Sequence, residues 1–85
     1  MGEHAKELED QSTRDKLMAT AERLYAIEGI AAVSLRRINR DAGQANASAL
    51  HYHFGSREEL ISSILERRMA TVNERRMRFL DELEA

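Results

Sequence analysis

Apolar residues recur along most of this chain at the three- and four-residue spacing of a helix that is buried on one side. The first stripe ends before Gly29, and Ser12 or Thr13 can cap its start, which predicts a helix over residues 13–28. Residues 1–12 show no such period, and we expect them to form a flexible N-terminal arm that is either disordered or loosely helical. The stripe consists of Leu17, Met18, Ala21, Leu24 and Tyr25.

Two shorter helices are predicted next. Ser34 is a favourable N-cap for a helix over residues 35–42, which Gly43 ends, and its apolar positions are three and four residues apart. A third periodic segment closes at Gly55, with Ala47, Leu50 and Phe54 about one turn apart. Two short helices joined at one glycine form a helix-turn-helix, so residues 13–55 are predicted to be a three-helix bundle that contains this motif.

A long fourth helix is predicted over residues 56–85. Its start carries the capping-box pattern, with Ser56 three residues before Glu59, and nothing within it breaks the helix. At 1.5 Å per residue it would extend about 40 Å, further than a small bundle can cover. Its apolar stripe continues through Phe79, Leu80 and Leu83, so we expect another domain or another chain to cover that end. The fold class is therefore all-α.

The composition excludes several classes of protein. The chain has 85 residues, which is enough for one domain, and it has no cysteine for a disulfide or a thiolate metal site. No apolar run approaches the roughly 20 residues that span a bilayer, and the acidic N-terminus is unlike a signal peptide. We expect a cytoplasmic protein that does not bind membranes.

The net charge of −2 conceals an uneven distribution. Residues 1–12 contain four acidic residues and one lysine, a net charge of −3. Residues 34–57 contain four arginines and one aspartate, a net charge of +3, and also two histidines. A basic segment at the helix-turn-helix favours a polyanionic partner at that place, although the whole chain is not basic.

The third helix is the expected reading element, since the major groove of B-form DNA admits an α-helix. With Ala47, Leu50 and Phe54 on its core face, short or hydrogen-bonding side chains point elsewhere, and the segment contains neither Lys nor Glu. Asparagine and serine can hydrogen-bond base edges, and an alanine methyl can contact thymine. The outward residues are Asn46, Ser48, Ala49 and Tyr52, with His51 at the margin.

Arginines near the start of the second helix suit phosphate oxygens. Arg36 and Arg37 lie in its first turn, where the helix terminus and the guanidinium groups both favour an anion. Arg57 and Tyr52 would extend this surface beyond the reading helix.

Two other classes of function are weighed against DNA binding. A metal-dependent enzyme is disfavoured, because His51 and His53 would point roughly 200° apart on a helix and the serines lack a nucleophile elbow. We therefore predict no catalytic residue, no metal ligand and no cofactor. A helical interaction module that pairs through the fourth helix remains the alternative.

Several motifs, in order along the chain, resemble the N-terminal DNA-binding domain of the TetR/AcrR family of bacterial transcriptional repressors. The resemblance covers about residues 13–66. The matching segments are AIEG at 26–29, VSLRRI at 33–38, DAG at 41–43 and YHFGSREEL at 52–60. The most specific stretch is YHFGS at 52–56. Between Gly43 and Phe54 the chain has one residue more than the commonest family pattern.

The resemblance implies a homodimeric repressor that binds a palindromic operator in double-stranded DNA. It also implies release by a small-molecule inducer that binds a C-terminal domain, which also serves dimerisation, beyond the linking helix at 56–85. The base-reading positions of the family correspond here to Asn46, Ala47, Ser48 and Ala49. Its phosphate-contacting positions correspond to Ser34, Arg36, His51, Tyr52 and Arg57.

Overall fold

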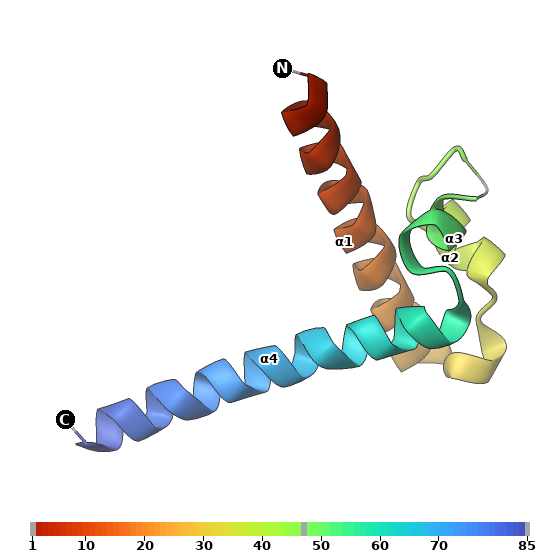
Figure 1. Cartoon of the computed structure of the whole chain (residues 1–85). Helices are drawn as coiled ribbons and strands as arrows, with labels where there is room; N and C mark the ends of the chain where they lie inside the picture. The colour runs from red at the N-terminus through yellow and green to blue at the C-terminus, as the bar shows by residue number, and fades with distance from the viewer. Residues whose placement is uncertain (1, 47, 85) are drawn as a thin grey trace.

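The computed structural model describes residues 2–46 and 48–84, and over these it contains four α-helices, one 3₁₀ turn and no strand. The predicted all-α fold with its helix-turn-helix and long fourth helix is confirmed. Figure 1 shows an L-shaped molecule in which α1 and α4 cross near the small helices α2 and α3. The elements in chain order are α1 (Gly2–Glu28), η1 (Ile30–Ala32), α2 (Leu35–Asp41), α3 (Ala49–Phe54) and α4 (Arg57–Glu84).

The hydrophobic core lies where the second half of α1 meets α2, α3 and the start of α4. Leu17 of α1, Ile38 of α2 and Leu60 of α4 are completely buried. The apolar stripes predicted from the sequence therefore face one another. The core residues are Leu17, Met18, Ala21, Leu24, Val33, Ile38, Leu50, Phe54, Leu60 and Ile64.

The predicted serine caps lie at the starts of α2 and α4. The Ser34 side chain accepts a hydrogen bond from the backbone N–H of Arg37 at 3.1 Å, and the Ser56 hydroxyl accepts one from Glu59 at 3.2 Å. Gly55 ends α3 with φ +80°, a backbone conformation that side chains with a Cβ rarely adopt. The chain can therefore turn sharply from α3 into α4.

The first helix is longer than the sequence predicted. It begins at Gly2 rather than near Thr13, so residues 2–12 are helical in the structure. No proline or internal glycine interrupts this stretch, and a helix that packing has already nucleated near Leu17 can extend at little cost. The missing apolar period is consistent with this, because residues 5–9 are exposed.

The third helix is shorter than predicted. It begins at Ala49, so Asn46 and Ser48 lie in the preceding loop, and Ala47 lies outside the described residues. The Asn46 carboxamide oxygen accepts hydrogen bonds from the backbone N–H of Ser48 at 3.0 Å and from its hydroxyl at 2.7 Å. These local bonds replace helical ones and delay the start of α3.

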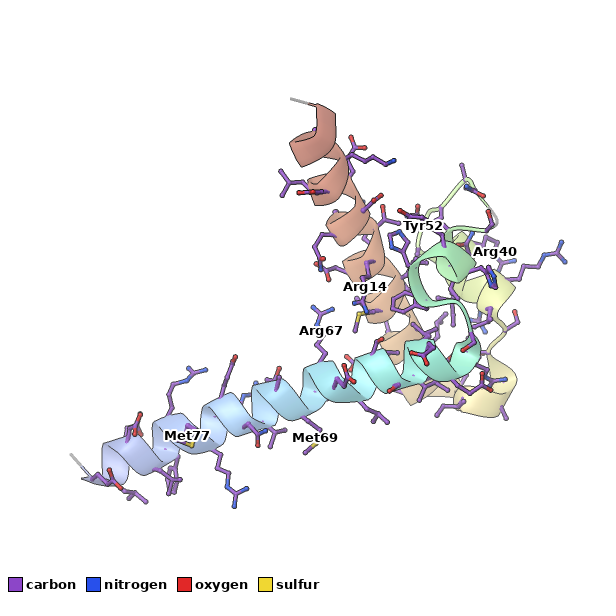
Figure 2. The ribbon with its side chains drawn as sticks, in the orientation of Figure 1. Arg14, Arg40, Tyr52, Arg67, Met69 and Met77 are labelled. Atoms are coloured by element: carbon purple, nitrogen blue, oxygen red, sulfur yellow. The ribbon has the colours of Figure 1, made fainter. Side chains whose placement is uncertain are left out.

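The fourth helix packs only along its first half. The Arg68 guanidinium donates to both carboxylate oxygens of Glu22 at 2.6 Å, and Arg67 lies 3.9 Å from Asp15, which joins α4 to α1. Beyond Thr71 the side chains are exposed, including Phe79 and Leu83, and Figure 2 shows Met77 on this projecting part. None of the described helices is long and apolar enough to cross a membrane.

Candidate DNA-binding surface

Asn39 holds the helix-turn-helix together. This side chain on α2 is only 5% exposed, and its amide nitrogen donates to the carbonyl of Asn46 at 2.9 Å. Its amide oxygen accepts from the backbone N–H of Leu50 at 3.2 Å. One buried carboxamide thus satisfies a loop carbonyl and an N–H in the first turn of α3, which fixes α3 relative to α2.

Arg14 supports α3 from the other side. Its guanidinium lies 4.7 Å from the centre of the Phe54 ring and donates to the Ser63 hydroxyl at 3.3 Å. Figure 2 shows Arg14 where α1 passes α3 and α4. This one side chain therefore contacts the last residue of α3 and the first half of α4.

Sequence reasoning assigned no role to Asn39 or Arg14. A signal for Asn39 was present, because it lies four residues after Leu35 and one after Ile38, within the apolar stripe of α2. A polar residue on a buried face needs hydrogen-bond partners, and Asn39 finds them in the next loop and helix. The sequence contained no comparable signal for Arg14, because its partners on α3 and α4 are 40 or more residues away.

The predicted base-facing residues divide into two groups. Asn46 and Ser48 are exposed on the loop that leads into α3. Ala49, which the sequence placed on the outward face, is only 9% exposed and belongs to the interior. Ala49 is the first residue of α3 and is buried together with Leu50.

Three of the predicted phosphate-binding residues are exposed side by side on α2 and α3. Arg36 and His51 line a shallow hollow between these helices. Ser34 is the N-cap residue of α2. Arg36 also lines a second hollow with Arg40 and Gln44. Within the described part of the chain, the Arg36 guanidinium makes no hydrogen bond or ion pair, so its positive charge is not compensated locally.

The other two arginines bind the protein itself. Arg37 forms hydrogen bonds with Glu28 at the end of α1 and lies 3.6 Å from Asp41. The hydrogen bond from Arg37 lowers the pKa of Glu28, and the same bond raises the pKa of Arg37. Arg57 donates to the carbonyl of Ile30 and so ties the start of α4 to the 3₁₀ turn.

Tyr52 lies at the boundary between α3 and α1. Its side chain is 69% exposed, and its hydroxyl donates to a carboxylate oxygen of Asp10 at 3.3 Å. The ring packs edge-on against the next residue, His53, with 4.8 Å between ring centres. The hydroxyl is thus directed toward α1, although the whole residue remains accessible (Figure 2).

The described residues contain no group of three or more His, Cys, Asp or Glu side chains that could hold a metal ion. His51 is exposed whereas its neighbour on the same helix, His53, is half-buried. The two histidine side chains therefore lie in different surroundings, as expected from their spacing of two residues on a helix.

These features define a helix-turn-helix DNA-binding domain, with a short second helix and an exposed, partly basic surface beside it. Comparison with protein families gives the particular family. A model of the bacterial regulatory proteins of the tetR family matches residues 17–64, and the chain belongs to this family. It is therefore a DNA-binding domain of a transcription regulator. No significant match was found among curated proteins or among solved structures.

Proposed function

We propose that this domain reads the operator of a ligand-released repressor, binding a palindromic site as a homodimer in the cytoplasm. In the intact regulator, a small-molecule inducer bound by another domain would end DNA binding. The proposal follows from membership of the tetR family together with the surface on α2 and α3. The observation that carries it is the Arg36 guanidinium, which lies beside the exposed His51 of α3 and makes no hydrogen bond or ion pair with the described residues.

The proposed division of labour follows the exposure of each residue. Ser34, Arg36, His51 and Tyr52 bind phosphate oxygens and set the position of the domain on the duplex. Asn46 and Ser48 approach base edges, the Asn46 amide nitrogen as donor and the Ser48 hydroxyl as acceptor or donor. Arg37 and Arg57 keep α2 and α4 in place through their bonds to Glu28 and Ile30.

The test is selection of duplex DNA from a random pool by two copies of the domain joined by a flexible linker. We expect enrichment of a palindrome, because tethering makes the second half-site contact intramolecular. Arg36→Ala should abolish enrichment, whereas Arg78→Ala removes the same charge from the projecting end of α4 and should not. A folded wild-type domain that enriches no sequence would contradict the proposal.

Affinity offers a second check. A single copy contacts one half-site, so we expect a Kd in the range of about 10⁻⁴ to 10⁻⁶ M at physiological salt. Nanomolar binding by a domain that sedimentation shows to be monomeric would contradict the requirement for a dimer.

A second candidate function is a helical interaction module in which α4 pairs with a helix of another chain. Exposed apolar residues on this helix follow the four- and three-residue spacings of a coiled-coil seam, except that Arg76 stands where one apolar residue would be expected. Sedimentation tests it: Phe79→Asp should dissociate a dimer formed by this helix, while Arg36→Ala should leave the dimer intact. The residues in the pattern are Leu65, Met69, Val72, Phe79 and Leu83.

A further inference from the structure

The N-terminal half of α1 is acidic and lies beside the proposed DNA-binding surface. Figure 1 shows this half of the helix projecting past α3, and α1 and α3 are in contact. Asp10 is the point of contact, since its carboxylate accepts the hydrogen bond from Tyr52. Asp10 is also half-buried, whereas residues 5–9 are exposed.

Helix stability does not account for an acidic residue at this position. Carboxylates stabilise a helix only within its first turn, where the N-terminal N–H groups are unpaired. The helix begins at Gly2, so Asp10 lies about two turns further on. Among the described residues, Asp10 has no cationic partner within 4 Å, so its charge is not explained by an ion pair either.

The Tyr52 hydroxyl has only one proton to donate. While that proton is shared with Asp10, the hydroxyl offers no donor to a phosphate oxygen. A phosphate that takes over the hydrogen bond must also approach the negative charge of Asp10. DNA binding through Tyr52 therefore requires the domain to give up an existing bond and to bring two anions together.

We propose that Asp10 is an intramolecular competitor for the phosphate group that Tyr52 binds, and that it lowers the affinity of the domain for DNA. This inference rests on the proposed DNA-binding role of Tyr52. Asp10 thereby sets how tightly the domain holds duplexes that offer only backbone contacts. Such duplexes cannot offset the loss of the Asp10–Tyr52 bond with base contacts, whereas an operator can.

The experiment measures binding of the 85-residue chain to a fluorescein-labelled duplex of mixed sequence by anisotropy at several salt concentrations. Asp10→Asn should tighten binding about three- to tenfold at low salt, because a neutral carboxamide holds the Tyr52 hydroxyl more weakly than a carboxylate does and leaves it available to a phosphate oxygen. Asp81→Asn is the matched control, because it makes the same change at the exposed far end of α4 and should alter binding little. The expected result is a gain of binding, which an unfolded variant cannot imitate.

Repeating both substitutions in a Tyr52→Phe background tests whether Asp10 and phosphate compete for the Tyr52 hydroxyl. Without the hydroxyl, Asp10→Asn should have no larger effect than Asp81→Asn. An unchanged effect of Asp10→Asn in that background would show simple charge repulsion and overturn the competitor role. Equal effects of Asp10→Asn and Asp81→Asn in the wild-type background would overturn it as well.

The Arg36→Ala variant separates this inference from the proposed function. If Arg36→Ala weakens binding while Asp10→Asn changes nothing, DNA binding stands and the role of Asp10 is overturned. If no variant binds the duplex at low salt, both the proposed function and the role of Asp10 are overturned.

Discussion

The backbone N–H of Leu50 donates to the side-chain oxygen of Asn39, and this bond joins the first turn of α3 to α2. The same carboxamide donates to the carbonyl of Asn46, so it spans the whole connection between the two helices. A short helix such as α3 has little stability of its own. The position of the reading element therefore depends on a buried side chain that does not contact DNA.

Asn39→Ala should lower the free energy of unfolding by about 1–3 kcal/mol, since it leaves the buried N–H of Leu50 without a partner and removes one of the two hydrogen bonds to the carbonyl of Asn46. Urea unfolding followed by circular dichroism measures the change. Asn73→Ala, at an exposed position on α4, is the control and should be close to neutral. Equal stability of the two variants would show that the Asn39 bonds contribute nothing.

Much of the fold followed from the sequence because helix boundaries in this chain depend on local chemistry. The Ser34 and Ser56 caps and the glycines with positive φ act within a few residues, and the predicted boundaries at Gly29, Gly43 and Gly55 are confirmed. The apolar stripes likewise predicted which faces meet. Local signals of this kind can be recognised without knowing the tertiary structure.

The site was less predictable because its geometry depends on contacts between distant segments. Asp10 can contact Tyr52 because α1 extends back to Gly2. Residues 1–12 have no apolar period, so the sequence did not predict this contact. The Asn46 hydrogen bonds delay the start of α3, and the burial of Ala49 depends on how α3 packs against the rest of the core. The sequence predicted that Arg37 binds phosphate, whereas in the structure Arg37 pairs with Glu28 at the end of α1.

Gly55→Ala should destabilise the domain by about 1 kcal/mol or more, because a Cβ strongly disfavours φ +80°. No atom of the described chain lies within 4 Å of the position that the new Cβ would occupy, so the effect is one of backbone conformation and not of packing. Thermal melting checks it. A melting temperature equal to that of the wild type would mean that the turn relaxes without cost.

The Glu28–Arg37 pair should make stability depend on pH in the acidic range. Arg37 holds the pKa of Glu28 below its ordinary value of 4.5, so the pair stabilises the fold above pH 4.5. That contribution is lost as the pH falls through the lowered pKa and Glu28 becomes protonated. Glu28→Gln should therefore be less stable than the wild type at pH 7, and the difference should shrink as the pH is lowered below 4.5.

The measurement for this pair is the melting temperature as a function of pH, with Glu82→Gln as a control on the exposed end of α4. The control should follow the wild-type profile. A constant difference between Glu28→Gln and the wild type at every pH would show that the pair does not titrate with folding.

Arg36 and Arg37 should differ in how they affect DNA binding, although they are neighbours with the same charge. Arg36 has no ion pair among the described residues, so Arg36→Ala should lower the slope of log K against log salt by about 0.9, as expected for one lost phosphate contact. Arg37 is bound to Glu28, so Arg37→Ala should lower the melting temperature and leave the slope nearly unchanged. Anisotropy titrations of a duplex at several salt concentrations distinguish the two. Equal changes in slope would mean that Arg37 leaves Glu28 to bind DNA, and the pair would then be broken in the complex.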